Sequence, residues 1–156
     1  MKLIFKQRMF SWLDSYDVFD EAGNTLFTVK GKFSWGKTLK IYDPNGNELG
    51  TVKSRVFSFL PKFDLYQGDT HFGTITKEFS FFKPKFHIDC NGWNVRGSFW
   101  EWDYEITSAT GEVVAAIGKE LWQWTDTYVI NVSKSENALP ALMLVIAIDA
   151  EKDSRG

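Results

Sequence analysis

The sequence predicts a mainly β protein, an antiparallel barrel of about twelve strands enclosing a hydrophobic C-terminal α-helix. Turn signals recur at nearly constant spacing, apolar and polar residues alternate between them, and one segment near the C-terminus is apolar on every side. Aromatic residues make up 17% of the 156 residues, and such rings favour half-buried strand surfaces. A chain of this length can bury a core without disulfides, so we expect one domain over residues 1–156.

The turn signals set the number of strands. Each contains a Gly, mostly beside Asn or Asp, and these residues supply the positive φ that tight hairpin turns need. They are Gly23-Asn24, Asn45-Gly46-Asn47, Gly68-Asp69, Asn91-Gly92 and Thr110-Gly111. Five hairpins, a first strand over about residues 2–8 and a last strand over about residues 127–133 give about twelve. Short connections make them antiparallel, and closure into a barrel removes exposed edges.

The segment after Ser133 has the pattern of a buried helix. Asn137 can cap it, Pro140 is tolerated in a first turn, and residues 138–148 are apolar on all sides. A helix of this length rises about 16 Å, half of a bilayer core, so it does not predict a membrane span. We expect the barrel over about residues 1–133 and the central helix over about residues 137–150, a buried strand over residues 144–148 being the alternative. The expected core residues of the helix are Leu139, Leu142, Met143, Leu144, Val145, Ile146 and Ile148.

Composition narrows the class of partner and the compartment. Cys90 is the single cysteine, and no continuous apolar signal region opens the chain, so we expect a cytoplasmic protein without disulfides. The net charge of -2 argues against nucleic acid as a partner. The charge is uneven, because residues 26–90 carry ten Lys/Arg against six Asp/Glu and residues 91–156 carry five against ten.

Residues of catalytic type form no convincing constellation. His87 and Asp89 would share one face of a strand and Cys90 the other, which excludes a Cys-His nucleophile pair. His71 follows a turn and is expected to be solvated, and two distant histidines with one cysteine cannot supply a zinc site. We therefore expect no catalytic residue, no metal and no cofactor, and predict a protein that is not an enzyme.

One set of acidic residues leaves a choice open. Glu101, Asp103 and Glu105 alternate with aromatic residues, which would place three carboxylates on one strand face. Such a face could bind calcium or serve glycoside hydrolysis, and the alternative is a solvated outer face opposite a buried aromatic one.

A basic and aromatic surface is the candidate binding site. Cations gather near aromatic stretches at residues 33–35, 57–59 and 79–82, and such a surface could meet anionic lipid headgroups or a protein partner. The alternative is that the same rings plug an end of the barrel and belong to its core. The basic residues are Lys30, Lys32, Lys37, Lys40, Lys53, Arg55, Lys62, Lys83 and Lys85.

Four stretches of the C-terminal half carry a family resemblance: Gly97-Ser98-Phe99 before Tyr104-Glu105-Ile106, Gly111 before Val114-Ala115 and Ile117-Gly118-Lys119, Trp124-Thr125-Asp126-Thr127-Tyr128, and Leu142 to Asp149. In their order and spacing, and in the turn rhythm of the N-terminal half, the sequence resembles the LURP-one-related family, within the tubby-like and phospholipid-scramblase superfamily. The resemblance implies a tubby-like barrel around a C-terminal helix, but no common biochemical activity. No stretch aligns with the tubby lipid-binding basic pair, so no lipid site is transferred.

The function expected from the sequence is binding or scaffolding. The protein would contact anionic membrane lipids, as a peripheral and not a transmembrane protein, or a protein partner. The alternative is a carrier whose barrel holds a small apolar ligand.

Overall fold

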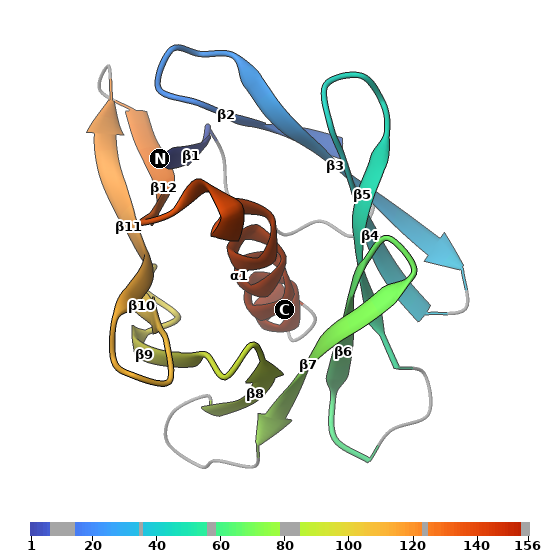
Figure 1. The fold of residues 1–156 in the computed structure, drawn as a ribbon. Coiled ribbons are helices and arrows are strands. Elements are labelled where there is room, and N and C mark those ends of the chain that lie inside the picture. Colours follow the sequence, from blue (N-terminus) through green and yellow to red (C-terminus); the bar gives the residue numbers. More distant parts are fainter. Residues whose placement is uncertain (7–14, 35, 56–58, 79–84, 123–124, 154–156) are drawn as a thin grey trace.

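The computed structural model shows twelve β-strands followed by a short 3-10 helix and one α-helix (Figure 1). It describes residues 1–6, 15–34, 36–55, 59–78, 85–122 and 125–153. The strands are β1 (Lys2–Phe5), β2 (Ser15–Phe19), β3 (Thr25–Ser34), β4 (Gly36–Tyr42), β5 (Glu48–Ser54), β6 (Lys62–Gln67), β7 (Thr70–Glu78), β8 (Lys85–Cys90), β9 (Asn94–Ser98), β10 (Asp103–Thr107), β11 (Val113–Trp122) and β12 (Thr125–Val132). The helices are η1 (Ser135–Asn137) and α1 (Ala138–Asp153).

All twelve strands belong to one antiparallel sheet that curls into a nearly closed barrel around α1 (Figure 1). Its order is β8-β7-β6-β5-β4-β3-β2-β1-β12-β11-β10-β9, so the first strand pairs with the last and the two ends of the meander meet there. The predicted fold class is therefore confirmed.

Two of the five turns, those that contain Gly23 and Gly46, share a hydrogen-bonding pattern between Asp and Asn. Asp20 and Asp43 each begin a five-residue stretch ending in Asn, and each carboxylate accepts the backbone N–H of the Asn four residues later, Asn24 or Asn47, at 2.8 Å. Hydrogen bonds from these Asn residues lower the pKa of both Asp side chains, mainly from the backbone N–H of Asn24 to Asp20 and from the side-chain amide of Asn47 to Asp43. The local bonds satisfy the turn backbone while the glycines take positive φ.

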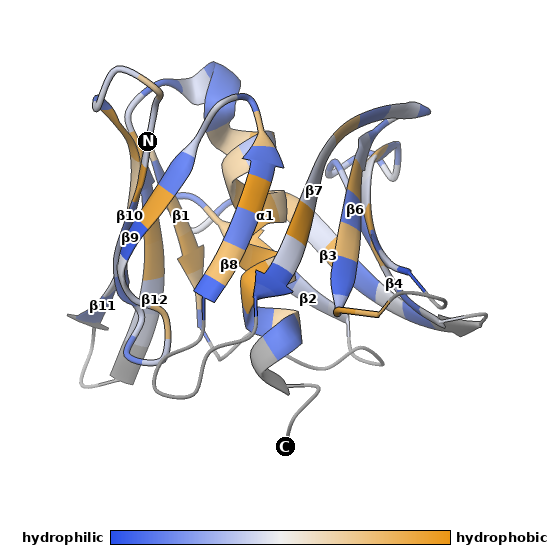
Figure 2. Ribbon diagram, turned by 90° about the horizontal axis from the view of Figure 1, so that it is seen from below, coloured by the Kyte–Doolittle hydropathy of each residue, from blue (hydrophilic) through white to orange (hydrophobic). Residues whose placement is uncertain are grey.

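Helix α1 fills the interior of the barrel. Every residue from Pro140 to Glu151 is buried, and α1 packs against β5, β6, β7 and β12. The strands supply inward apolar residues at every second position, visible along β8 as alternating hydrophilic and hydrophobic bands (Figure 2). No helix among the described residues has both the length and the hydropathy needed to cross a bilayer.

One predicted hairpin is wrong. The Asn91-Gly92 turn is present, with φ of 53° and 70°, but the strands it joins, β8 and β9, are the two outer strands of the sheet and do not pair. Trp93, directly after the turn, is buried in the core, and each strand forms its ladder with its other neighbour, β7 or β10. The barrel wall therefore has a seam between β8 and β9.

Truncation of single side chains of α1 should lower the free energy of unfolding in proportion to how deeply each side chain is buried. Leu142 is fully buried whereas Leu139 is partly exposed. We expect Leu142→Ala to lower the free energy of unfolding by about 2–5 kcal/mol, and Leu139→Ala by roughly 1 kcal/mol. Urea denaturation of both variants measures this, and equal losses would contradict a helix surrounded by the sheet.

Candidate functional site

Four of the predicted basic residues lie together on the outer face of β3, β4 and β5. Lys30 lies directly opposite Lys40, and Lys32 is aligned with Thr38 of β4 and, through it, with Lys53 of β5. The alternate positions of these strands face the core, so strand periodicity places the lysines outside. Like charges at directly opposed positions repel, which makes this a face of concentrated positive charge.

Only part of this charge is neutralised within the described residues. Lys40 Nζ lies 2.5 Å from Glu48 Oε1, and the hydrogen bond from Lys40 is the main cause that lowers the pKa of Glu48. Lys32 and Lys53 form no ion pair with any other described residue. Two cations therefore remain available to an anionic partner, one on either side of Thr38.

An exposed phenyl ring lies in the connection between β5 and β6, which follows the strand that carries Lys53. The side chain of Phe59 is 96% exposed, the most exposed large apolar residue in the described chain. Arg55 precedes it and Lys62 follows it, and Arg55 is fixed by two hydrogen bonds to Asp64, at 2.8 and 2.9 Å. An aromatic ring left in water between cations is typical of an interaction surface rather than of a core plug.

The chain topology places several of the predicted residues at one end of the barrel. Consecutive antiparallel strands are joined alternately at the two ends, so the Gly-containing turns lie at one end. The other, which we call the connector end, is where odd-numbered strands finish and even-numbered strands begin. Phe59 lies there, as does Trp100, which is 47% exposed.

The remaining predicted basic residues are more scattered. Lys37 is the second residue of β4 and Lys85 is the first of β8, both at the connector end, but β8 is separated from β5 by two strands. Lys83 lies outside the described residues, as do most of the aromatic residues predicted beside the lysines: Trp35, Phe57, Phe81 and Phe82. The structure therefore places Lys30, Lys32, Lys40 and Lys53 on one outer face, with Arg55, Phe59 and Lys62 following β5 along the chain. Lys37 lies at the connector end of β4, and Lys85 lies apart on β8.

A second group of polar residues lies inside the barrel at the connector end, around the last turn of α1. Glu151 forms an ion pair with Lys77 of β7 at 3.0 Å, and the side chains of Glu151 and Lys77 are only 4% and 10% exposed. Asp149 accepts a hydrogen bond from Nε1 of Trp102 at 3.2 Å. These contacts tie the helix to two different parts of the wall.

Two tyrosines from different strands of the wall also lie near Asp149. Burial, and then the negative charge of Asp149, raise the pKa of Tyr16 on β2 and of Tyr104 on β10. Both phenols therefore stay neutral at physiological pH. The sequence analysis missed this group, although charged residues at the end of an otherwise apolar segment were a visible signal for buried partners.

The predicted placement of His87, Asp89 and Cys90 is confirmed. His87 and Asp89 are exposed on the outer face of β8, and Cys90 is buried on the inner face. Burial, and then the charge of Asp89, raise the pKa of the Cys90 thiol to about 12, which suppresses thiolate nucleophilicity.

His71 is less isolated than expected. Its Nε2 lies 3.0 Å from Oδ1 of Asp64, and the hydroxyl of Thr74 lies 3.0 Å from the same oxygen. Arg55 binds this carboxylate as well, and the hydrogen bonds from Arg55, His71 and Thr74 lower the pKa of Asp64 although its burial opposes this. The network holds the base of the connection that carries Phe59.

The predicted face of three carboxylates does not form as one strand. Glu101 lies before β10, which begins at Asp103, and Trp102 between them adopts a positive φ of 54°. Glu105 accepts hydrogen bonds from Arg96 of β9 at 2.8 and 3.1 Å. No group of three or more potential metal ligands of the His, Cys, Asp and Glu types gathers among the described residues.

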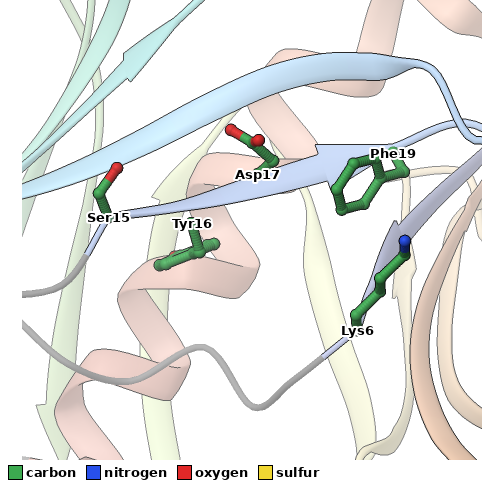
Figure 3. A pocket seen from close by; sticks show the side chains of 5 residues that line it. All are labelled: Lys6, Ser15, Tyr16, Asp17 and Phe19. Atoms are coloured by element: carbon green, nitrogen blue, oxygen red, sulfur yellow. The ribbon is translucent and has the colours of Figure 1, made fainter.

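A pocket opens on the wall where β1 and β2 diverge (Figure 3). It has a volume of about 290 Å³ and is lined by Lys6, Ser15, Tyr16, Asp17 and Phe19. Lys6 lies over the ring of Phe19 at 4.5 Å, so the pocket presents an ammonium group above an aromatic floor.

Comparison with known proteins agrees with this architecture. The family model described as LURP-one-related matches residues 1–149. The chain belongs to the LURP-one-related family. A relative in Bacillus subtilis (strain 168), "Uncharacterized protein YxjI", is 29% identical over 150 residues, covering 96% of this chain and 92% of the relative.

The fold is shared with a plant protein. An X-ray structure of a protein from Arabidopsis thaliana superposes with a TM-score of 0.65, covering 96% of this chain and 90% of that one. At 16% identity this similarity concerns the fold alone. Neither the LURP-one-related family nor the bacterial relative gives a sign of enzymatic activity.

The buried ion pair should matter far more to stability than a surface pair. Lys77→Met removes the ammonium group that pairs with the buried Glu151 carboxylate, and we expect the free energy of unfolding to fall by about 3–5 kcal/mol. Lys2→Met removes the exposed pair with Glu120, at 3.4 Å, and should cost less than about 1 kcal/mol. Urea denaturation compares them, and a loss for Lys77→Met as small as for Lys2→Met would show that the inner pair is solvated.

Cys90 should make the protein less stable in alkali. An unfolded thiol loses its proton at about pH 8.5, whereas the folded thiol keeps it until about pH 12, so folding stability falls as pH rises through this window. We expect the free energy of unfolding to decline more steeply between about pH 9 and 10 in the wild type than in Cys90→Ala, by up to roughly 1.4 kcal/mol per pH unit. Urea denaturation across this range tests it, and identical slopes would contradict a protonated thiol.

Proposed function

We propose that the protein is a non-enzymatic binding module that docks on anionic membrane surfaces through Phe59 and the cations around it. The observation that carries the proposal is the 96% exposure of Phe59, which lies between Arg55 and Lys62 in the connection that follows β5. A ring of this kind gains free energy by entering the headgroup region, while nearby cations are attracted to acidic lipids.

The order of residues along the strands supports a specific orientation. β5 runs towards the connector end, so Lys53 and then Arg55 approach the Phe59 tip, and Lys32 lies closer to that end than Lys30. Docking with this corner of the barrel down would bring Lys32, Lys53 and Lys62 to the membrane with the ring.

The expected affinity is moderate. Each cation near an anionic membrane contributes about 1 kcal/mol, and a buried phenyl ring about 1.5–3 kcal/mol. A few cations and one ring therefore support reversible, salt-sensitive attachment. A cytoplasmic location and peripheral membrane contact belong to this proposal.

No observation favours the carrier alternative. The space that an apolar ligand would occupy holds the side chains of α1, which are buried from Pro140 to Glu151. A protein partner that recognises the same exposed ring and cations is the competing outcome of the experiment below.

Vesicle flotation tests the proposal. We expect the protein to float with vesicles containing about a third phosphatidylserine and not with phosphatidylcholine alone, with release at high salt. Phe59→Ala should weaken binding by about tenfold and Lys32→Glu with Lys53→Glu should abolish it, because these changes remove the ring and the free cations.

The matched control is Val113→Ala, which truncates a 39% exposed apolar residue at the opposite end of the barrel and should bind like the wild type. Absence of binding to both kinds of vesicle would overturn the membrane proposal and leave the protein partner. Binding that Phe59→Ala and Val113→Ala weaken equally would place the contact elsewhere.

A further inference from the structure

The barrel wall has two places where neighbouring strands are weakly joined. Between β8 and β9 the sheet has no ladder, and the described contacts there include the turn after Cys90 and an edge-on contact of the Phe86 and Phe99 rings, 5.1 Å apart. Between β1 and β2 the described residues form a single register pair, Ile4 with Phe19, and the pocket opens beside it.

These two seams divide the wall into two leaves. The seven-strand leaf runs from β2 to β8, and the five-strand leaf consists of β9, β10, β11, β12 and β1. Within each leaf the ladders between neighbours extend over four to eight register pairs. Each leaf is therefore a continuous hydrogen-bonded sheet, whereas the joins between the leaves are short or absent.

Helix α1 contacts both leaves, and its last turn does so through charged groups. It packs on β5, β6 and β7 of the seven-strand leaf and on β12 of the five-strand leaf. Glu151 pairs with Lys77 of the seven-strand leaf at 3.0 Å, whereas Asp149 binds Trp102, between β9 and β10, at 3.2 Å. The two carboxylates lie about half a helical turn apart, and each links the helix to a different leaf from inside the barrel.

The backbone of Trp102 is strained in the conformation that lets its side chain bind Asp149. Trp102 adopts a φ of 54°, a region that bulky residues rarely occupy, and its ring is nevertheless only 2% exposed. Its ring packs edge-on against Phe5 of β1 and Tyr128 of β12. The contacts with the Asp149 carboxylate and the two rings therefore offset the backbone strain of Trp102.

We propose that the last turn of α1 is a latch that holds the two leaves together, and that the barrel opens along the β8–β9 seam when this latch is released. Apolar packing alone would retain the helix, and buried ions are costly compared with apolar residues of the same size. Asp149 and Glu151 add a directional link to each leaf, at the end of the barrel where the exposed Phe59 lies. The latch goes beyond membrane docking and does not depend on it.

Thiol labelling at two buried sites of the same leaf can detect the opening. In a Cys90→Ala background, Ile75→Cys places the probe on β7, one strand from the seam, and Val52→Cys places it on β5, the middle strand of the leaf. Ile75 and Val52 are 1% and 0% exposed, so both probes report opening rather than surface reactivity. Labelling is measured over a series of low urea concentrations, because local opening depends weakly on urea and global unfolding strongly.

Trp102→Phe keeps an aromatic ring but removes the Nε1 donor, and it is the variant that releases the latch. We expect labelling of the Ile75→Cys probe to rise about tenfold with a weak urea dependence, while labelling of the Val52→Cys probe rises only as far as the measured loss of global stability requires. Ile41→Val, a core change in the middle of the seven-strand leaf, is the matched control and should alter both probes alike.

Should Trp102→Phe lower stability too far for a native measurement, Asp149→Asn removes the latch charge with little change of shape and should give the same pattern at a smaller amplitude. Equal changes at both probes, or no change at either, would overturn the latch, because Asp149 would then serve only the general stability of the fold.

Discussion

The structure depends on the burial of α1. A helix that is apolar on every side cannot lie on a flat sheet without exposing half of its surface to water, so the sheet has to surround it. Twelve short antiparallel strands achieve this because a meander can curl until its first strand, β1, reaches its last, β12. The helix in turn fills an interior that would otherwise be a large apolar cavity. Each part therefore supplies the surface that the other must cover.

This mutual dependence explains how the polar residues are distributed. Outward strand positions can hold almost any polar residue, and on β3–β5 several of them are lysines. Because neighbouring lysines repel one another, their proximity does not contribute to the stability of the fold. Inside, polar residues are tolerated only with partners, and they are concentrated at the last turn of α1, where Lys77 and Trp102 provide them. The outer cations are thus candidates for binding, and the inner charges are candidates for control of the fold.

Most of the architecture could be predicted because its determinants are local. Gly and Asn at the turns, alternation along the strands and the apolar run of α1 each act over a few residues, and together they specify a meander around a helix. The β8–β9 seam could not be predicted in this way. Asn91-Gly92 has hairpin chemistry, and whether the strands then pair depends on where Trp93 and the neighbouring strands pack, which is a property of the closed barrel.

The candidate site was predicted less completely for the same reason. The two-residue periodicity of strands places four lysines on one face: Lys30, Lys32, Lys40 and Lys53. The sequence does not show which aromatic ring of the connections stays exposed. Only the structure separates the exposed Phe59 from the buried Trp102. Nor could a local pattern reveal that Asp149 and Glu151 reach opposite leaves, because Lys77 and Trp102 are distant in the sequence. A nearly closed barrel with an incomplete seam gains from a link across its interior, and the end of the central helix contacts both sides of this one.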